Sequence, residues 1–429
     1  MIAALKIICG HRIADAPPPC DRDNGAQMTT VCIDCRYLGA RPSGIGEVVR
    51  GLIDHLPSMA PDLRFLLLRN PAHSGPLSTS SNVEERAAPQ AANGPATMWW
   101  LSKVVRMDDV DLFHAPSNIM PAGLGMPCVT TVHDVMWLTH PQWCRTGLRG
   151  AVERGFYRHG IGRALRSAAV IATVSKATAD AIAAIMPQAA ARTTVTLSGV
   201  SSRFHPVTPA EQTLKALGIN PKRRFVLTVG QYAPYKNHEG VVRAFALAFG
   251  DRSDVDLVMV QRMGDGARKL LNIADSLGLN GRVILLSTVP EQALVELYSA
   301  ALALLHPSLC EGFGNPLAEA MACGCPVVTS DISAMPEVVG GSARLANPYD
   351  YQEIAAQLKA VIEAPAETAR LREKGLQRAA QLTWRAFAAA NLAIYRRVLN
   401  GDTTAPKRTT ARLERAMDTS STPFSITAS

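Results

Sequence analysis

The sequence has no long apolar run and no ordered set of cysteines. None of its uninterrupted apolar stretches reaches the roughly 20 residues that a membrane-crossing helix needs. Its nine cysteines lie at irregular positions, which is typical of reduced thiols in a cytosolic protein and not of a disulfide framework. Cys32 and Cys35 have the spacing of a redox or zinc pair, but they fall inside an expected strand with no second pair at a suitable distance. We expect buried thiols at both positions.

The composition excludes a disordered chain. Hydrophobic residues make up 47% and charged residues 19%, as in an ordinary globular protein. The net charge of +8 favours anionic partners, without choosing among nucleic acid, lipid headgroups and phosphorylated substrates. Part of the positive charge is a run of arginines broken only by Glu153, which comprises Arg145, Arg149, Arg154, Arg158, Arg163 and Arg166. We expect this run on one or two helices, either as a solvated face or as a surface attracted to a membrane.

The first residues lack the features of a secretory signal. The apolar run 2–9 is short and contains Lys6, and the next stretch is proline-rich and polar. Met28 immediately precedes the first clear strand. Residues 1–27 are therefore expected to be a flexible extension or to lie upstream of a true start at Met28.

Strand-like runs alternate with helical stretches in two series, which indicates parallel sheets with crossover helices. The first series is 31–34, 65–68, 112–114, 129–132, 170–174 and 194–197. The second is 225–230, 255–260, 283–286, 303–305 and 326–329. The polar segment 74–97 is expected to be a surface loop, and 401–429, rich in Thr, Ser and charge, a disordered tail. We predict an α/β protein with two doubly wound, Rossmann-like domains, at 28–200 and 201–382.

The most informative segment is 311–328, where two glutamates flank a glycine-rich turn that opens a short helix. Asn315 is a good N-cap, Pro316 suits the first helical position, and Gly324 closes the helix. A helix start exposes unpaired backbone N–H groups, and glycines let a ligand approach the backbone closely. The turn is therefore predicted to be an anion-binding site, which we call the anion seat.

Glu311 and Glu319 add hydrogen-bond acceptors to this seat. A carboxylate accepts strongly from the hydroxyl groups of a sugar or a ribose. Acids beside an anion seat thus suit a phosphorylated, hydroxyl-rich ligand. The alternative is that Glu319 only complements the helix dipole and that Glu311 is a solvated loop acid.

The segment 306–316, continued by 326–328 and 335–340, resembles the donor-binding signature of retaining family 4 glycosyltransferases. That signature is a glutamate, seven residues and a second glutamate. The resemblance covers roughly residues 29–400 and is most specific at 306–340. It implies the GT-B architecture, two Rossmann-like domains facing across a cleft, with a C-terminal helix at 383–400 that crosses back to the first domain.

The resemblance also implies roles for the residues of the signature. Glu311 would contact the donor sugar, and Glu319 would hold the nucleotide ribose. Sugar and phosphate oxygens would be received by the backbone between them, which comprises Gly312, Phe313, Gly314, Asn315, Pro316 and Leu317.

A candidate cation follows the expected strand 225–230. Open α/β sheets place ligands at the C-terminal ends of their strands, so Gly230 and Lys236 would face the cleft. Lys236 can neutralise a leaving diphosphate, although a lysine after a strand can equally be an ordinary surface residue. Family members often carry an arginine just after the glycine. Here Gln231 occupies that position, which leaves one cation instead of two.

The first domain would contribute residues from a glycine turn, from a strand end and from the start of a helix. Gly44 and Gly46 resemble the family loop that approaches the donor phosphates and the acceptor, with a tight turn that binds nothing as the alternative. His133 and Asp134 end another expected strand and would reach the cleft opposite Glu311, with Asp134 as a candidate on the acceptor side. The resemblance implies that His133 contacts the donor sugar near the reacting carbon, and a purely structural histidine is the alternative. Ser175 also matches a family segment, and it is suited to cap the helix that follows.

Two pairs of acids have the spacing of the metal-binding pair found in the other large glycosyltransferase fold. They are Asp109 with Asp111, and Asp254 with Asp256. Each pair lies at or just before an expected strand, so the alternating exposure of strand residues explains it. We expect no obligatory metal and no other cofactor.

The resemblance implies a retaining, metal-independent hexosyltransferase, with Glu311, His133 and Lys236 as its catalytic residues. It would transfer mannose from GDP-mannose to a hydroxyl of a glycan or lipid-linked acceptor in surface polysaccharide synthesis. No residue suggests an enzymic nucleophile near the anomeric carbon, and the resemblance implies a front-face mechanism, in which the leaving phosphate helps to take the acceptor proton. The alternatives are a nucleotide-sugar epimerase of the same architecture and an inactive nucleotide-sugar binding protein. We expect a cytoplasmic protein, with peripheral contact at the inner face of the membrane and no nucleic-acid partner.

Overall fold

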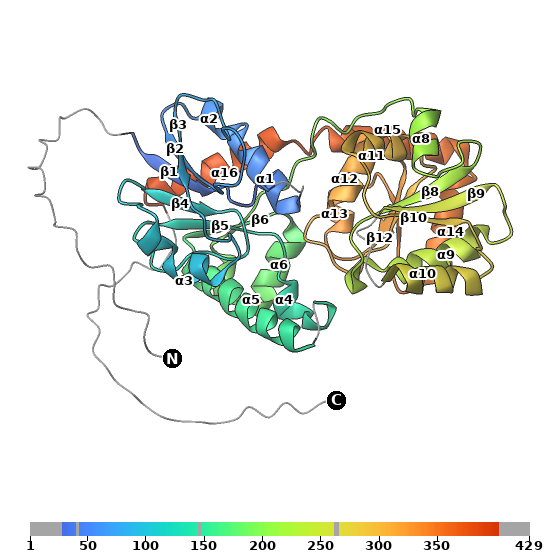
Figure 1. The fold of residues 1–429 in the computed structure, drawn as a ribbon, viewed down its shortest axis with the longest axis horizontal. Helices are drawn as coiled ribbons and strands as arrows, with labels where there is room; N and C mark the ends of the chain where they lie inside the picture. The colour runs from blue at the N-terminus through green and yellow to red at the C-terminus, as the bar shows by residue number, and fades with distance from the viewer. Residues whose placement is uncertain (1–27, 40–42, 145–146, 261–265, 403–429) are drawn as a thin grey trace, which may run out of the picture.

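The computed structural model describes residues 28–39, 43–144, 147–260 and 266–402. The predicted extension at 1–27 and the predicted tail, apart from residues 401 and 402, lie outside the described residues. The chain forms two parallel sheets, each with helices on both faces, which lie side by side (Figure 1). The predicted α/β architecture of two doubly wound domains is confirmed.

The first sheet has seven parallel strands in the order β3-β2-β1-β4-β5-β6-β7. They are β1 (Thr30–Asp34), β2 (Arg64–Arg69), β3 (Val83–Ala87), β4 (Leu112–Ala115), β5 (Cys128–Val132), β6 (Val170–Thr173) and β7 (Thr193–Val195). Strand β1 pairs on one side with β2, where Ile33 is opposite Leu67, and on the other with β4, where it is opposite His114. The order of the strands reverses between β1 and β4, and ligands bind outside such switch points.

Helices and turns connect these strands. They are α1 (Gly44–Ile53), α2 (Leu56–Met59), α3 (Pro95–Val104), α4 (Met136–Thr139), the 3-10 turn η1 (Pro141–Trp143), α5 (Gly147–Ser167), α6 (Lys176–Ile185) and α7 (Pro187–Ala190). Most of the arginine run lies on the single helix α5, whereas Arg145 lies outside the described residues.

The second sheet has six parallel strands in the order β10-β9-β8-β11-β12-β13. They are β8 (Arg224–Val229), β9 (Val255–Val260), β10 (Val283–Leu286), β11 (Leu304–His306), β12 (Val327–Ser330) and β13 (Arg344–Ala346). Its helices and turns are α8 (Glu211–Ala216), η2 (Pro234–Lys236), α9 (His238–Phe249), α10 (Gly266–Ser276), α11 (Glu291–Ala300), α12 (Asn315–Ala322), α13 (Met335–Val339), α14 (Tyr351–Ile362) and α15 (Pro365–Ala379). The switch point of this sheet lies between β8 and β11.

The apolar strands are buried on both sides. In β1, Val31 and Ile33 belong to one apolar cluster, whereas Cys32 belongs to the cluster on the opposite face. Because helices cover both faces of a parallel sheet, its central strands carry apolar residues at every position. Cys32 and Cys35 are buried free thiols, and burial raises the pKa of both. The interpretation of this pair as buried thiols is confirmed.

The last helix, α16 (Trp384–Leu399), follows the second domain in sequence but packs against α1, α2, β4 and β6 of the first (Figure 1). A Cβ at Gly51 of α1 would overlap the ring of Trp384, so a glycine is required there. Deeper in the sheet, the hydroxyl of Tyr395 lies 2.5 Å from Nδ1 of His114. Burial lowers the pKa of His114 to about 3, so this hydrogen bond involves a neutral ring.

The chain crosses between the domains twice, and the two crossings touch. The backbone N–H of Val200 in the first crossing donates to the carbonyl of Leu382 in the second, at 2.9 Å. A Cβ at Gly199 would overlap the backbone of Trp384, so the crossings approach each other at a glycine. Two connecting segments that lie side by side therefore join the domains, and we call this paired connection the hinge.

The prediction that 74–97 is a surface loop is wrong. This segment contains the edge strand β3 and the first residues of α3. Strand β3 is polar because it lies at the edge of the sheet, and Glu84 and Glu85 pair with Arg64 and Arg69 of β2 at 2.7 and 3.1 Å. The short strand β13 was not predicted either. Among the described helices, none combines the length and apolar character that crossing a bilayer requires.

We expect Tyr395→Phe to lower the free energy of unfolding by about 1–3 kcal/mol, because it leaves a buried nitrogen of His114 without its partner. Urea denaturation followed by circular dichroism measures this loss. The control is Tyr349→Phe, whose side chain is 65% exposed and which should change stability by less than about 0.5 kcal/mol. Equal stability of Tyr395→Phe and the wild type would show that the buried hydrogen bond does not hold α16 in place.

Candidate active site

Two helix N-termini meet where the switch points of the two sheets face each other. Helix α1 follows the central strand β1, and α12 follows the central strand β11. A Cβ at Gly44, the first residue of α1, would lie 3.5 Å from the side-chain nitrogen of Asn315, the first residue of α12. Helix N-termini carry partial positive charge and free N–H groups, so their convergence favours an anion.

The first helix begins earlier than predicted. Gly44 and Gly46 form the first turn of α1 and not a separate turn before it. Ser43 caps the helix, because its hydroxyl accepts from the N–H of Gly46 at 3.0 Å. Both glycines therefore lie at the helix end that points toward the second domain.

The predicted N-cap of the second helix is wrong by one residue. Gly314, with φ of +96°, precedes the helix, and Asn315 and Pro316 are its first two residues. Glycine adopts this left-handed conformation without the cost that a Cβ imposes, so the turn ends one residue earlier than Asn315 suggests. The N–H of Leu317 donates to the carbonyl of Gly314 at 2.9 Å. Pro316 has no N–H, so it offers no backbone donor at this helix start.

The side chains of the turn anchor it in the core. Phe313 is 5% exposed and Leu317 is fully buried, and both belong to the apolar cluster beneath α12. At the other end, Gly324 has φ of +71° and follows the end of α12, as predicted. The buried side chains of Phe313 and Leu317 thus hold the turn on the core of the second domain, and its backbone faces the first domain.

The two domains are in close backbone contact at Gly312. A Cβ at this position would overlap the carbonyl oxygen of His133, which follows β5 in the first domain. The hydroxyl of Thr178 in α6 donates to the same carbonyl at 3.1 Å. A glycine is therefore required if the domains are to meet as they do here.

Glu311 forms a buried ion pair with Lys236. Its Oε1 lies 2.6 Å from Nζ of Lys236 and 3.1 Å from Nε2 of His306, and the two charged side chains are 10% and 11% exposed. Burial raises the pKa of Glu311, but Lys236 and His306 outweigh it and lower that pKa to about 2. Burial likewise lowers the pKa of Lys236, and Glu311 reverses this, so its net shift is upward. Both groups are charged at neutral pH.

The surrounding residues fix this ion pair. Gly230 has φ of +152°, and a Cβ there would lie 3.5 Å from the Lys236 side chain, which passes over it. Ser333 accepts from the N–H of Glu311 at 3.1 Å and donates to its carbonyl at 3.0 Å. His306 and Ser333 had no predicted role. The position of His306 at the end of a central strand, five residues before Glu311, is the signal that could have found it.

Gln231 lies at the rim of the site. Its side chain is exposed, and its Nε2 donates to the hydroxyl of Tyr235 at 3.3 Å. Among the described residues, Lys236 is a cation that the second domain places beside Gly230.

Glu319 lies in α12, one turn beyond the start of the helix. Its Oε2 accepts from the hydroxyl of Tyr298 at 2.8 Å. Burial raises the pKa of Glu319 to about 7, although Tyr298 and Arg203 act in the opposite direction. The sequence contained no signal for Tyr298, because it comes from a different helix, α11.

Two further contacts join the domains around the site. Arg203, in the first crossing, pairs with Glu47 of α1 at 3.0 Å and with Glu291 of α11 at 2.6 Å. Ser175 caps α6 as expected, and the carboxylate of Glu337 from α13 accepts from the N–H of Lys176 at 2.8 Å. An acid of the second domain thus completes the cap of a helix in the first.

His133 and Asp134 lie on the first-domain side of the cleft. Nε2 of His133 lies 3.0 Å from the carbonyl of Pro116, so it carries the proton, and Nδ1 is the acceptor. Burial lowers the pKa of His133, which keeps its ring neutral. Asp134 accepts from the N–H of Met136 at 2.9 Å, and burial raises its pKa. Asp134 and Glu311 line opposite walls of an interdomain cleft of about 330 Å³.

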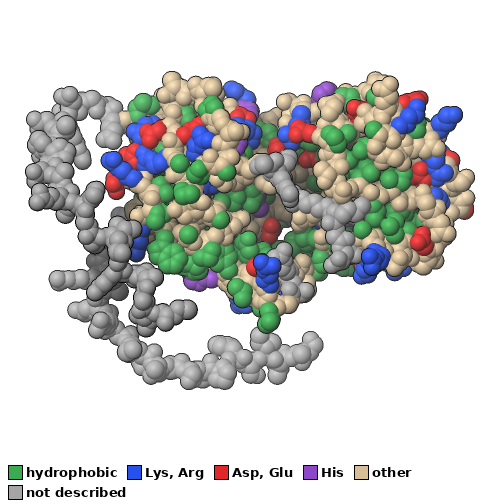
Figure 2. Space-filling model, viewed as in Figure 1, with side chains coloured by type: hydrophobic (Ala, Val, Ile, Leu, Met, Phe, Trp, Pro, Cys, Tyr) green, Lys and Arg blue, Asp and Glu red, His purple; other side chains and the backbone are tan. Residues whose placement is uncertain are grey.

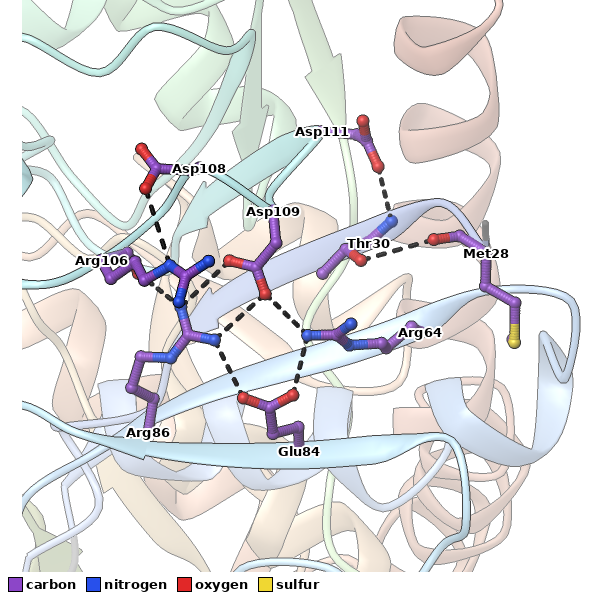
Figure 3. Close-up of polar contacts among 9 residues, drawn as sticks. All are labelled: Met28, Thr30, Arg64, Glu84, Arg86, Arg106, Asp108, Asp109 and Asp111. Atoms are coloured by element: carbon purple, nitrogen blue, oxygen red, sulfur yellow. Dashed lines mark hydrogen bonds and ion pairs between the residues drawn. The ribbon is translucent and has the colours of Figure 1, made fainter. Parts of the chain in front are cut away.

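Arginines and a backbone N–H engage the first acid pair. Asp109 pairs with Arg64 at 2.7 Å and with Arg86 at 3.1 Å, and Glu84 bridges the same two arginines (Figure 3). The hydrogen bond from Arg86 lowers the pKa of Asp109 to about 2. Asp111 accepts from the backbone N–H of Thr30 at 2.8 Å.

The second acid pair has the same kind of partners. Asp254 pairs with Arg252 at 2.8 Å, and Asp256 pairs with Arg223 at 2.5 Å. Among the residues that the structure describes, no group of three or more His, Cys, Asp or Glu side chains is arranged to hold a metal ion. Both acid pairs therefore have a structural explanation.

The architecture and the site define the chain as a glycosyltransferase of the GT-B class. Residues 42–203 match the family described as Glycosyltransferase Family 4, and residues 210–378 match Glycosyl transferases group 1. The chain belongs to the family 4 glycosyltransferases. The predicted family and the GT-B architecture are confirmed, whereas the roles of the individual site residues stay predictions.

Several known proteins are similar to this chain. O-antigen chain mannosyltransferase B of Escherichia coli is 30% identical over 279 residues, which cover 64% of this chain and 71% of that protein. The MMP alpha-(1->4)-mannosyltransferase of Mycolicibacterium hassiacum is 28% identical over 344 residues, covering 75% and 80%. Anabaena Alr3699/HepE, solved in complex with UDP-glucose, has a TM-score of 0.63 at 21% identity, covering 86% and 99%. At that identity the structural likeness establishes the fold alone.

We expect Gly312→Ala to reduce kcat/KM for sugar transfer by about a hundredfold, because displacing the domains by the size of a methyl group misaligns the two halves of the site. Steady-state kinetics measure the loss. The control is Gly125→Ala, since a Cβ at Gly125 has no neighbour within 4 Å. Wild-type kinetics in Gly312→Ala would mean that the contact with His133 is not part of the active arrangement.

Proposed function

We propose that this chain transfers mannose from GDP-mannose to a hydroxyl of a surface glycan or its lipid-linked precursor, with retention at the anomeric carbon. The observation that carries the proposal is the buried ion pair between Glu311 and Lys236, which lies beside the start of α12 and opposite His133. Two relatives of this chain are mannosyltransferases, and one of them builds an O-antigen chain. These names support mannose as the donor sugar.

Lys236 and the N-termini of α1 and α12 would receive the diphosphate. Charge builds on the leaving group during transfer, so fixed positive charge and N–H dipoles stabilise the transition state more than the ground state. This positive charge belongs to the protein, which supports a transfer without an obligatory metal or other cofactor. The amides of residues 312–315 would add hydrogen bonds to the same oxygens.

Glu311 would hold the donor sugar. Lys236 and His306 both lie near its Oε1, so Oε2 is the oxygen that would accept from sugar hydroxyls. His133 would present its Nδ1 to the sugar from the other domain. A neutral histidine and an ionised glutamate together provide acceptors for hydroxyl groups on both sides of the ring.

The carboxylates of the cleft are suited to roles other than nucleophilic attack. Glu311 is paired with Lys236, and Asp134 accepts from the backbone N–H of Met136, the first residue of α4. These engagements support a front-face mechanism, in which the acceptor hydroxyl attacks from the side of the leaving phosphate. The phosphate oxygen would then take the acceptor proton as the glycosidic bond forms and the sugar–phosphate bond breaks.

Product analysis tests the proposal directly. The full chain is incubated with GDP-mannose or UDP-glucose and a hydroxyl acceptor, and NMR identifies the linkage of any product. An α-mannoside is the expected product. A free epimer of the donor would instead indicate an epimerase, and tight donor binding without any product would indicate an inactive binding protein.

We expect Glu311→Gln to reduce the rate of transfer at least about a hundredfold, because the neutral amide loses its charge-assisted bonds to Lys236 and to the sugar. The control is Glu363→Gln, an exposed acid at the end of α14. Circular dichroism checks that both variants fold. Full activity in Glu311→Gln would remove this residue from the proposed mechanism.

Nucleotide-sugar affinity should depend on the ionisation of Glu319. Its pKa of about 7 means that it is protonated below neutral pH, whereas ribose hydroxyls donate best to an ionised carboxylate. Binding must then expel a proton, so affinity should fall by up to about tenfold for each pH unit below 7. Calorimetry in buffers of different ionisation enthalpy counts that proton.

Glu319→Gln is the matched variant for this measurement. It cannot release a proton, so its affinity should be weaker at pH 8 and independent of pH between 5.5 and 8. If the wild type binds the nucleotide sugar equally well at pH 5.5 and 8, Glu319 does not hold the ribose as a carboxylate.

A further inference from the structure

A groove lined by aromatic side chains opens beside α4 on the first domain. It has a volume of about 600 Å³, and its lining includes Trp137 of α4, Phe156 and Tyr157 of α5, and the polar residues Asn93 and Glu153. Figure 2 shows hydrophobic side chains gathered at the lower edge of this domain, where Figure 1 places α3 and α5. A concave site with aromatic walls and a few polar groups is typical of ligand binding, and the donor site described above does not use this one.

Packing holds the aromatic rings of the groove in fixed positions. Trp137 stacks on Tyr157 with ring centroids 4.6 Å apart, and both side chains pack against the buried apolar cluster beneath them. The ring of Phe156 is edge-to-face with that of Tyr157 at 5.5 Å and with that of Trp99 of α3 at 6.0 Å. Because these rings are already ordered, a ligand that stacks on them would cost little side-chain entropy.

The short helix α4 and the turn after it connect the groove to the interdomain cleft. Trp137 lines the groove, whereas its neighbour Met136 lines the cleft together with Asp134. His140 and Trp143, just after α4, also line the cleft, and their rings are stacked with centroids 4.2 Å apart. A ligand that extends from the cleft along α4 would therefore pass from one pair of stacked rings to another.

We propose that this groove binds the sugars of an oligosaccharide acceptor that lie beyond the sugar that reacts in the cleft. The C–H groups on one face of a sugar ring carry partial positive charge, and they pack on the negative face of an aromatic ring. The hydroxyl groups around the sugar would hydrogen-bond to the amide of Asn93 and the carboxylate of Glu153. The inference rests on the proposed function, and it assigns the acceptor to the class of glycans several sugars long.

The polar lining argues against an acyl chain in the groove. An acyl chain would remove water from the carboxylate of Glu153 without offering a hydrogen-bond donor in return, and such burial costs free energy. A sugar chain offers a hydroxyl donor at each ring. A monosaccharide could not occupy the cleft and the groove at once, so the groove would add affinity only for longer acceptors.

Calorimetric titration of the full chain with mannose and with α-linked manno-oligosaccharides tests the groove without any donor. Affinity should rise by at least about tenfold from the monosaccharide to the tetrasaccharide, because added sugars stack on the aromatic rings. Val152→Trp should remove this gain, because Val152 lines the groove and is 75% exposed, so a larger side chain would fill the groove without disturbing the core. The control is Val104→Trp on α3, at a valine that is 55% exposed, which should bind like the wild type.

Removing a ring gives an independent variant. Trp137→Ala should reduce the affinity for the tetrasaccharide about tenfold, whereas Phe156→Tyr keeps an aromatic ring in the groove and should preserve it. Circular dichroism checks that each variant folds.

Transfer kinetics separate the groove from the proposed reaction. Val152→Trp should raise the KM for a tetrasaccharide acceptor about tenfold and leave kcat unchanged, because the groove holds sugars that do not react. Binding that strengthens with chain length but leads to no transfer would support the groove and contradict the proposed function. The groove would be overturned if affinity did not depend on chain length, if no oligosaccharide bound, or if Val152→Trp bound the tetrasaccharide as tightly as the wild type.

Discussion

The arrangement of the site depends on one backbone contact between the domains, at Gly312 and the carbonyl of His133. His133 directly follows β5, and Gly312 lies in the turn between β11 and α12, so their contact holds the C-terminal edges of two separate sheets together. From it follow the approach of Gly44 to Asn315, the convergence of two helix N-termini and the cleft between Asp134 and Glu311. A side chain at position 312 would separate these groups, because interiors this closely packed have no room to absorb a methyl group.

The site reconciles two demands that oppose each other. A diphosphate requires positive charge, whereas a sugar and a ribose require acceptors such as carboxylates. Pairing Glu311 with Lys236 keeps a carboxylate ionised beside an anion seat, since each charge stabilises the other. Glu319 has a different environment. It is buried beside Tyr298, and burial raises its pKa to about 7, so it is only partly ionised at neutral pH. Glu311, before the turn, and Glu319, within α12, therefore differ in charge at neutral pH because their neighbours differ.

Closure of the domains is stabilised from several sides. The paired crossings at Val200 and Leu382 form the hinge, and α16 fastens the end of the chain to the first domain. Arg203 joins acids of both domains, and Glu337 completes the cap of α6. The ion pairs are partly exposed, and such pairs contribute little each. They orient the domains, while the glycine contact sets how closely the domains approach.

Much of the fold could be predicted from the sequence, because the signals are local. Continuous apolar runs identified the central strands, and the spacing of Glu311, the glycines and Glu319 located the turn before α12. Local reasoning failed where partners lie far away in the chain. Strand β3 is stable because Glu84 and Glu85 form ion pairs with arginines of β2. The N-cap of α12 is Gly314 and not Asn315, because Gly314 adopts a left-handed conformation.

The sequence by itself determined the family, the two-domain architecture and the segment that carries the predicted donor site. Only the tertiary structure decided which groups meet there: Lys236 with Glu311, Tyr298 with Glu319, and His133 with Gly312. Such pairings depend on distances between segments that are tens to hundreds of residues apart, and the pattern along a chain does not encode these distances. The charge state of each glutamate depends on the same distances, because burial and neighbouring charge set a pKa.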